Sequence, residues 1–414
     1  MDTTRRTILR GMAAAPIVAS AGGLLVPGAA MAAPAATMRY RNKVPGGGGK
    51  TYADVIRQLR ARAERPWDEW HIAKAPVETI LERKEEWTGE YADVDWHGKT
   101  PPAGELPEFA ASFKWRKADF EAGDWRPQGI TTNRDAGRLG DKTVLMVSWD
   151  ARTDRANDQG TRLSIVELQG TEPPRYWNVL LVEPFMNGNH PSYKPIVIHA
   201  GGLAWYQGLL YVTDSKSNTL RVFSVADIFN VRYGDGKDPQ VSDRFGFAAG
   251  SYWARQYAYV MPQTGSYERR PGGLKFSQVS VDRTTSPHTL LVNEFKRAKR
   301  KSPQSPMERW ALRQDGFLNG TSFETYAVPV GSIQGAASIR NSYYLSTSGG
   351  FGNGRLDKWT RDGGVSRLYQ VPPGPEDLSY DAGRNALWSL GEYAVGDDED
   401  NTTVNSRYVY AIKL

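Results

Sequence analysis

The chain has 414 residues, among them 13 Trp, 20 Tyr, 13 Phe, 42 Gly and 25 Pro, with a formal charge of +6 and no Cys. The missing thiols exclude a disulfide framework, a thiolate zinc site, a cysteine-ligated iron–sulfur cluster and a blue-copper centre. Neither a dinucleotide-binding fingerprint nor a G-x-S-x-G nucleophile elbow occurs. We therefore expect no NAD, and no haem or thiolate-bound metal, and a Ser-His-Asp enzyme is disfavoured.

Residues 1–32 have the three parts of an export signal. Arg5 and Arg6 lie in a charged start, an apolar run follows, and Ala30 and Ala32 bracket a small-residue cleavage site. The order Thr-Arg-Arg-x-apolar-Leu resembles a bacterial twin-arginine signal, which implies the translocation machinery as a partner and a secreted or cell-envelope protein. A stable membrane anchor is not expected, because Pro and Gly interrupt an apolar run that is already short.

Removal of the arginines of this signal lowers the net charge of the remaining chain below +6. So small a positive charge gives no reason to expect a nucleic-acid partner. Residues 33–50, rich in Ala, Pro and Gly, are predicted to be a flexible linker. Residues 51–108 are predicted to be a helical extension, because apolar residues recur at helical spacing at Tyr52, Val55, Ile56 and Leu59, and again at Val77, Ile80 and Leu81.

From residue 109 to residue 414 the apolar pattern changes to alternation of period two, and one unit recurs five times. In its second copy the unit contains 202–205, 210–214 and 220–223, and in its fourth copy 335–338, 343–346 and 356–359. Four strands in each unit predict an all-β fold, a five-bladed β-propeller, whose last blade is completed by a strand near Phe113. A β-sandwich is the alternative, but it does not require this repeat.

Two segments of the repeat carry a further resemblance. Pro375-Glu376-Asp377-Leu378-Ser379, followed by Ala386-Leu387-Trp388, is similar to units of lactonase-like, calcium-dependent propellers such as the gluconolactonase group, and Pro127-Gln128-Gly129-Ile130 is a variant with an amide in place of the acid. The resemblance implies calcium as a cofactor and an ester or lactone as a substrate. Similar units occur in propellers that only bind.

Propeller geometry places the starts of the innermost strands and the ends of the second strands on one face. We expect the ligand-binding residues to lie there, and they are Gln128, Trp149, Asp150, Asp214, Glu294, Gln334, Glu392 and Tyr393. Trp149 and Tyr393 would stack on a ligand. Glu376 and His199 are the candidate catalytic groups, and Glu376, Asp214 and Asp150 are the candidate calcium ligands.

The sequence leaves the function open between three hypotheses. The first is a secreted propeller that binds an extracellular small molecule or glycan on this face without turnover. The second is calcium-assisted hydrolysis of an ester, lactone or glycoside, and the third is a scaffold that docks another protein. Against all three stands a structural interpretation, in which the acids and amides cap strand ends. The charged segments 296–301 and 397–400 are interpreted as solvated loop tips.

Overall fold

The structure is a computed structural model that describes residues 36–84, 86–94, 96, 101–137, 139–151, 159–234, 236–269, 273–298, 304–394, 397 and 405–414. The segment that the sequence predicts to be an export signal, with Arg5, Arg6, Ala30 and Ala32, lies outside the described residues. No helix in the described parts of the chain has the length and apolar character needed to span a bilayer.

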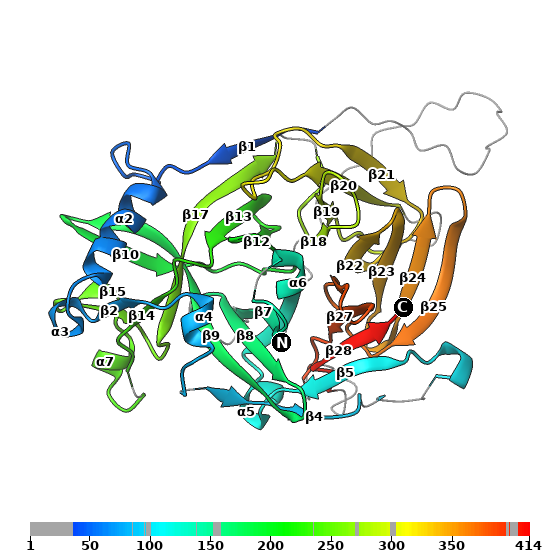
Figure 1. Cartoon of the computed structure of the whole chain (residues 1–414), viewed down its shortest axis with the longest axis horizontal. Coiled ribbons are helices and arrows are strands. Elements are labelled where there is room, and N and C mark those ends of the chain that lie inside the picture. The colour runs from blue at the N-terminus through cyan, green and yellow to red at the C-terminus, as the bar shows by residue number, and fades with distance from the viewer. Residues whose placement is uncertain are drawn as a thin grey trace, which may run out of the picture.

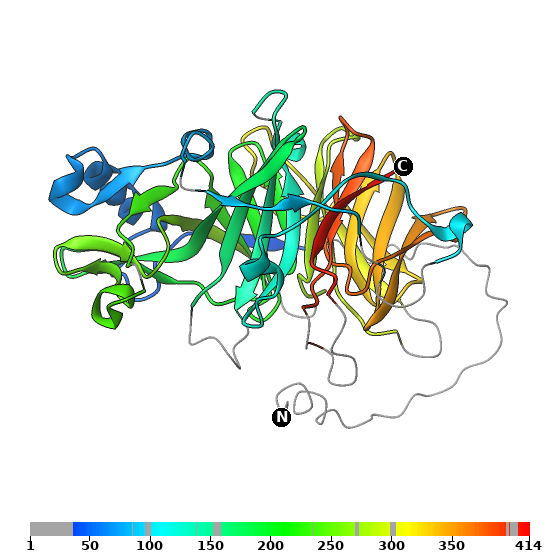
Figure 2. The same cartoon turned by 90° about the horizontal axis from the view of Figure 1, so that it is seen from below.

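The fold is mostly β and is built from antiparallel groups of four strands (Figures 1 and 2). The first group contains β6 (Trp125–Thr132), β7 (Thr143–Ala151), β8 (Arg162–Gln169) and β9 (Glu172–Asn187). The second contains β11 (Leu203–Tyr206), β12 (Leu209–Asp214), β13 (Thr219–Ser224) and β17 (Tyr259–Arg269). The third contains β18 (Gln278–Asp282), β19 (Thr289–Asn293), β20 (Ser305–Ala311) and β21 (Glu324–Val328).

The fourth group contains β22 (Ile333–Ile339), β23 (Ser342–Gly349), β24 (Gly352–Thr360) and β25 (Gly364–Val371). The last group contains β26 (Ser379–Asp381), β27 (Ala386–Leu390), β28 (Tyr408–Lys413), β5 (Phe109–Lys114) and, beyond β5, the short β4 (Glu90–Tyr91). β5 pairs antiparallel with β28, so the predicted closure of the last unit by a strand near Phe113 is confirmed.

The innermost strands surround a common axis. β6 contacts β11, β11 contacts β18, β18 contacts β22, β22 contacts β26, and β26 returns to β6. The short helix α6 (Asn133–Ala136) contacts β6, β11 and β26, and Figure 1 shows it near the centre, with β7, β12, β18, β22 and β27 around it. This arrangement agrees with the predicted repeat of four-stranded units.

Glycines allow the innermost strands to approach one another closely. A Cβ added at Gly202 would lie 2.4 Å from the backbone nitrogen of Val279, and one at Gly129 would lie 2.9 Å from the backbone of Gly202. Real Cβ atoms do not tolerate such distances, so a larger residue at either position would push two strands apart. The glycine at the start of the repeated unit therefore has a steric role in the packing of the innermost strands.

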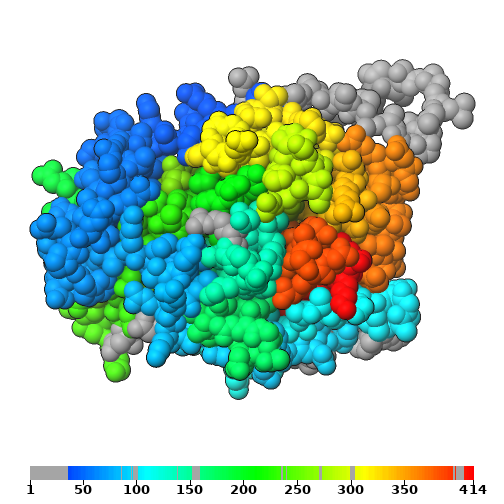
Figure 3. All heavy atoms as spheres, viewed as in Figure 1, coloured from blue at the N-terminus to red at the C-terminus, as the bar shows by residue number. Residues whose placement is uncertain are grey.

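A lobe, at the left of Figure 1, packs on the outside of the first two groups. It combines N-terminal elements, strand β10 that follows β9, and an insertion between β13 and β17. β2 from the N-terminal part pairs with β14 from the insertion. Its elements are α2 (Tyr52–Ala63), α3 (Trp67–Trp70), β2 (Ile72–Lys74), α4 (Val77–Ile80), β10 (His190–Pro195), β14 (Phe229–Val231), α7 (Pro239–Ser242), β15 (Phe245–Ala248) and β16 (Ser251–Ala254). In the space-filling view the blue N-terminal residues form one continuous surface with the green ones (Figure 3).

The predicted helical extension is found in part. α2 has a capping box between Thr51 and Asp54 and buries Tyr52, Val55, Ile56 and Leu59, the stripe that the sequence predicts. The range 51–108 also contains strands β2, β3 (Trp87–Thr88) and β4, and a short 3₁₀ helix, η1 (Ala103–Glu105). Within 33–50, where the sequence predicts a linker, β1 (Met38–Arg41) pairs with β17, because its alternate apolar residues can pack on that strand.

Candidate functional site

Six polar residues come together at one end of the innermost strands, and we call them the axial cluster: Gln128, Asp150, His199, Gln334, Glu376 and Glu392. Three contacts connect them in pairs. Gln128 Nε2 donates to Glu392 Oε2 (3.2 Å), Gln334 Nε2 donates to Glu376 Oε1 (2.6 Å), and His199 Nδ1 lies 2.9 Å from Asp150 Oδ2. All six were predicted from the repeat to share one face.

Glu376 is the most deeply placed acid of the cluster, with 3% of its surface exposed. Its backbone N–H donates to the Leu390 carbonyl (2.9 Å), and its own carbonyl accepts from Ser346 Oγ (2.6 Å). Burial raises the pKa of Glu376 well above its usual range, and the nearby Glu392 carboxyl raises it further, while the hydrogen bond from Gln334 opposes the shift. Glu376 therefore holds its proton to a higher pH than an exposed glutamate does.

Glu392 has the surroundings of a carboxylate. It accepts from Gln128 and from the hydroxyl of Tyr393, and the Arg126 guanidinium interacts with it electrostatically. Burial raises the pKa of Tyr393, and Glu392 raises it further, so this hydroxyl keeps its proton. Two acids thus lie near each other at the axis, and burial raises the pKa of one of them, Glu376. Such a pair is suited to donating and accepting protons.

The region around Glu392 is also contacted by two arginines and an aspartate, which are Arg126, Arg407 and Asp397. Arg126 Nη2 lies 3.0 Å from Asp397 Oδ1, and the fully buried Arg407 donates from Nε to the Glu392 carbonyl (3.0 Å). Burial lowers the pKa of Arg407 to about 10. The interpretation of 397–400 as a solvated loop tip is thus wrong for Asp397, which is buried in this ion pair, and 398–400 lie outside the described residues.

Asp377, which the sequence analysis quoted only within a motif, connects three of the innermost segments. Its Oδ2 accepts from the backbone N–H groups of Ile130 and Leu203, both at 3.0 Å, and its Oδ1 accepts from Leu378 (2.9 Å). These bonds fix the position of the neighbouring Glu376 at the axis. Its position between Glu376 and the apolar Leu378 in the motif was the signal that sequence reasoning could have used.

Three predicted ligand-binding residues have other surroundings. Trp149 is fully buried, with its ring centroid 4.8 Å from that of Trp115, so it offers no exposed face for stacking. Asp214 is buried in an ion pair with Arg221 (2.9 Å). Glu294 accepts from the Lys275 backbone N–H (3.2 Å), at the edge of the molecule. These surroundings arise because β7 continues past Trp149, and because Asp214 and Glu294 have local partners.

Tyr393 keeps a position beside the axial cluster, although it is nearly buried. Its ring lies 4.7 Å from that of Phe351, which is 41% exposed. Gly374 makes this packing possible, since it has a φ of +61° and a Cβ there would lie 2.6 Å from the Tyr393 ring. Phe351, rather than Tyr393, presents the exposed aromatic surface near the axis.

The candidate calcium ligands do not assemble into a metal site. Among the residues that the structure describes, no group of three or more His, Asp or Glu side chains is arranged to hold a metal ion. Two of the candidate ligands already have other partners, since Asp214 forms an ion pair with Arg221 and Asp150 contacts His199. Burial raises the pKa of Glu376, which disfavours the ionised form that a hard cation requires.

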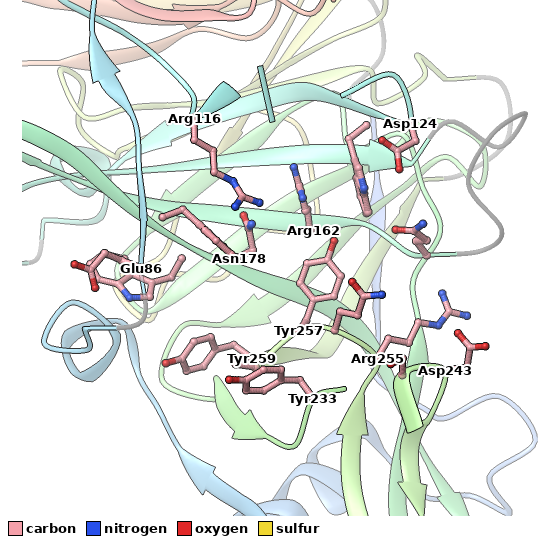
Figure 4. A pocket seen from close by; sticks show the side chains of 17 residues that line it. Glu86, Arg116, Asp124, Arg162, Asn178, Tyr233, Asp243, Arg255, Tyr257 and Tyr259 are labelled. Atoms are coloured by element: carbon pink, nitrogen blue, oxygen red, sulfur yellow. The ribbon is translucent and has the colours of Figure 1, made fainter. Parts of the chain in front are cut away.

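A cavity of about 1010 Å³ lies to the side of the axial cluster, and the sequence analysis missed it. Its lining includes Trp125 and Arg162 from the first group of strands, Arg116 before α5 (Lys117–Phe120), and Tyr233 and Tyr257 from the insertion between β13 and β17 (Figure 4). We call it the lateral cavity. Segments so far apart in sequence give no local signal for a shared site.

Neither a family model nor a curated protein matches the chain. Solved structures similar to it include a glutaminyl cyclase from Myxococcus xanthus, with 10% identity and a TM-score of 0.36 over 76% of this chain and 98% of that one. A gluconolactonase from Xanthomonas campestris shows 9% identity and a TM-score of 0.34 over 80% of this chain and 99% of that one. With values this low, the function has to be argued from the chain's own residues.

Proposed function

We propose that this chain is an exported five-bladed β-propeller that binds a small extracellular molecule or glycan at the axial cluster. The ring of contacts from β6 through β11, β18, β22 and β26 supports the blade count. The export signal of residues 1–32 supports an extracellular ligand. Changing both Arg5 and Arg6 to Lys should leave the precursor inside the cell, whereas continued export of that variant would contradict the twin-arginine route.

One observation carries the binding proposal. Gln128 Oε1 and Asp150 Oδ1 are buried acceptors without a hydrogen-bond partner among the described residues. An unsatisfied buried acceptor costs about 1–3 kcal/mol, so a ligand that donates hydrogen bonds to both atoms would bind favourably. Sugar hydroxyls have this chemistry. His199, whose side chain is half exposed and bonded to Asp150, is the group that an entering ligand would displace.

The experiment compares two Glu→Gln variants on the same predicted face. Glu392→Gln keeps the shape of the side chain but replaces the carboxyl beside Gln128 with an amide. Glu294→Gln changes an acid whose side chain contacts Lys275 and Lys296. Calorimetric titration with a panel of polyols and mono- and disaccharides should find at least one ligand. Its affinity should be at least tenfold weaker for Glu392→Gln than for the wild type and unchanged for Glu294→Gln. Equal affinities for wild type and Glu392→Gln would contradict the proposal.

A second candidate function is metal-independent hydrolysis at the same site. The raised pKa of Glu376 beside the Glu392 carboxylate favours it, because one group can protonate a leaving oxygen while the other activates water. Turnover of a glycoside, ester or lactone should then be lost in Glu376→Gln and should persist in EDTA. Binding without turnover by the wild type would exclude this candidate. Co-purification of a protein partner with both the wild type and the Glu392→Gln variant would favour the docking scaffold instead.

A further inference from the structure

The lateral cavity has the size of an organic ligand site and a mixed lining. Its volume of about 1010 Å³ is at the upper end of the range for pockets that hold small molecules. Four parts of the chain meet there: the outer strands β8 and β9, the insertion that precedes β17, the segment that leads into β3, and the connection from β5 to the start of β6. The cavity is therefore built by tertiary packing and does not depend on one loop.

Aromatic rings form much of its wall. Trp125, Trp177 and Tyr259 are buried around it, whereas Trp87 and Tyr233 are 44% and 56% exposed. Figure 4 shows Tyr233 and Tyr259 close together, with Arg116 farther up in the view. Tyr257 lies beside Arg162 and forms a side-chain hydrogen bond with it. Aromatic rings that are exposed together in the lining of one cavity offer apolar surface to a ligand.

The arginines of the cavity are held in fixed orientations. Arg162 is buried, lies 2.7 Å from Asp119, and stacks on Trp125 and Trp149 at 4.5 and 4.6 Å. Arg116 shares the same Asp119 (2.8 Å), and its guanidinium lies 3.5 Å above the Trp87 ring. Because the stacking and the ion pairs fix both guanidinium planes, their remaining N–H groups are preorganised donors.

Several polar groups of the lining are suited to hydroxyl groups. Arg162 Nε and Trp177 Nε1 are buried donors that have no hydrogen-bond partner in the described parts of the chain. Asn178, Gln159 and Gln256 add amides, each of which both donates and accepts. The lining thus combines apolar ring faces with planar polar side chains.

The charges of the lining cancel. Arg116, Arg162 and Arg255 face the cavity together with three acids, which are Glu86, Asp124 and Asp243. A strongly anionic or cationic ligand would leave part of this set unpaired, so the lining favours an uncharged ligand with many hydroxyls. A pyranose has such hydroxyls at its rim and an apolar face that fits an aromatic ring.

We propose that the lateral cavity is a binding site for a neutral oligosaccharide, separate from the axial cluster. The Tyr233 and Trp87 rings would lie against sugar faces, and the guanidinium and amide groups would bond the hydroxyls. This inference does not rest on the function proposed for the axial cluster, since the two sites share no lining residue.

The test uses a panel of cello-, xylo-, malto-, manno- and chito-oligosaccharides, measured by saturation-transfer NMR and calorimetry. Tyr233→Ala removes an exposed ring from the cavity, and Phe323→Ala, which is also 56% exposed but lies elsewhere, is the matched control. We expect at least one oligosaccharide to bind, with affinity at least tenfold weaker in Tyr233→Ala and in Trp87→Ala. The Phe323→Ala and Glu392→Gln variants should retain wild-type affinity.

Three results would overturn the inference. The first is that no oligosaccharide of the panel binds the folded wild type at millimolar concentration. The second is that binding is lost in Glu392→Gln and retained in Tyr233→Ala, a result that would support the axial site alone. The third is that an acidic oligosaccharide such as tetragalacturonate, or a peptide, binds the cavity more tightly than any neutral sugar. Unchanged melting temperatures in the variants show that each comparison concerns folded protein.

Discussion

Asp135 provides a test of the packing around the axis through its titration. It lies in α6, is 4% exposed, and accepts a hydrogen bond from Ser379 Oγ (2.6 Å). Burial raises its pKa from 3.8 to about 8, with hydrogen bonds from Ser379 and Thr131 and the charge of Arg283 opposing the shift and Asp381 adding to it. In the unfolded chain the same group ionises near pH 4.

The sign of the pH effect follows from proton binding. Between about pH 4 and pH 8 the folded protein holds a proton that the unfolded chain has lost, so the free energy of unfolding falls as pH rises. The slope is about 1.4 kcal/mol for each pH unit, or roughly 5–6 kcal/mol over the whole window. The stabilisation is fully present below pH 4 and is lost as the pH passes 8.

Asp135→Asn removes this titration and keeps the acceptor for Ser379. Urea unfolding followed by tryptophan fluorescence should show similar stability of variant and wild type at pH 4, and a variant that is more stable by several kcal/mol at pH 8.5. Asp141→Asn, an exposed acid in the same connection between β6 and β7, should follow the wild type at both pH values. Parallel pH profiles for Asp135→Asn and wild type would refute the reasoning, because they would mean that Asp135 is ionised in the fold.

Two further predictions concern the axial region. Gly374→Ala should lower the free energy of unfolding by roughly 1–3 kcal/mol in chemical unfolding, because of the positive φ and the contact of the added Cβ with Tyr393. The loss should exceed that of Gly350→Ala, a position with a φ of +72° but open space around it. Equal losses would show that the contact with Tyr393 has no cost. EDTA should leave the melting temperature unchanged, since the described residues form no metal site, and a fall of several degrees that calcium reverses would restore the calcium hypothesis.

The sequence predicted much of the strand framework because the relevant signals are local. Alternation of apolar residues marked the four-stranded units, and helical spacing from Tyr52 to Leu59 marked α2. The lobe could not be predicted in this way. Its pairing of β2 with β14 joins residues 72–74 to residues 229–231, and neither strand carries information about its distant partner.

The candidate site was predictable to the extent that strand ends determine position. Gln128, Gln334 and Glu376 lie together because each stands at the start of an innermost strand. Whether a side chain then faces the axis depends on local partners, which the repeat does not encode. Asp214 shows the difference, since Arg221 on the adjoining strand holds it.

The central claim is that the axial cluster binds a ligand through hydrogen-bond donors. The most direct measurement is a crystal structure of the protein with the tightest-binding polyol or saccharide of the calorimetric panel. We predict ligand hydroxyls within hydrogen-bond distance of Gln128 Oε1 and Asp150 Oδ1, with His199 displaced. A ligand found in the lateral cavity and absent from the axial cluster would contradict the claim.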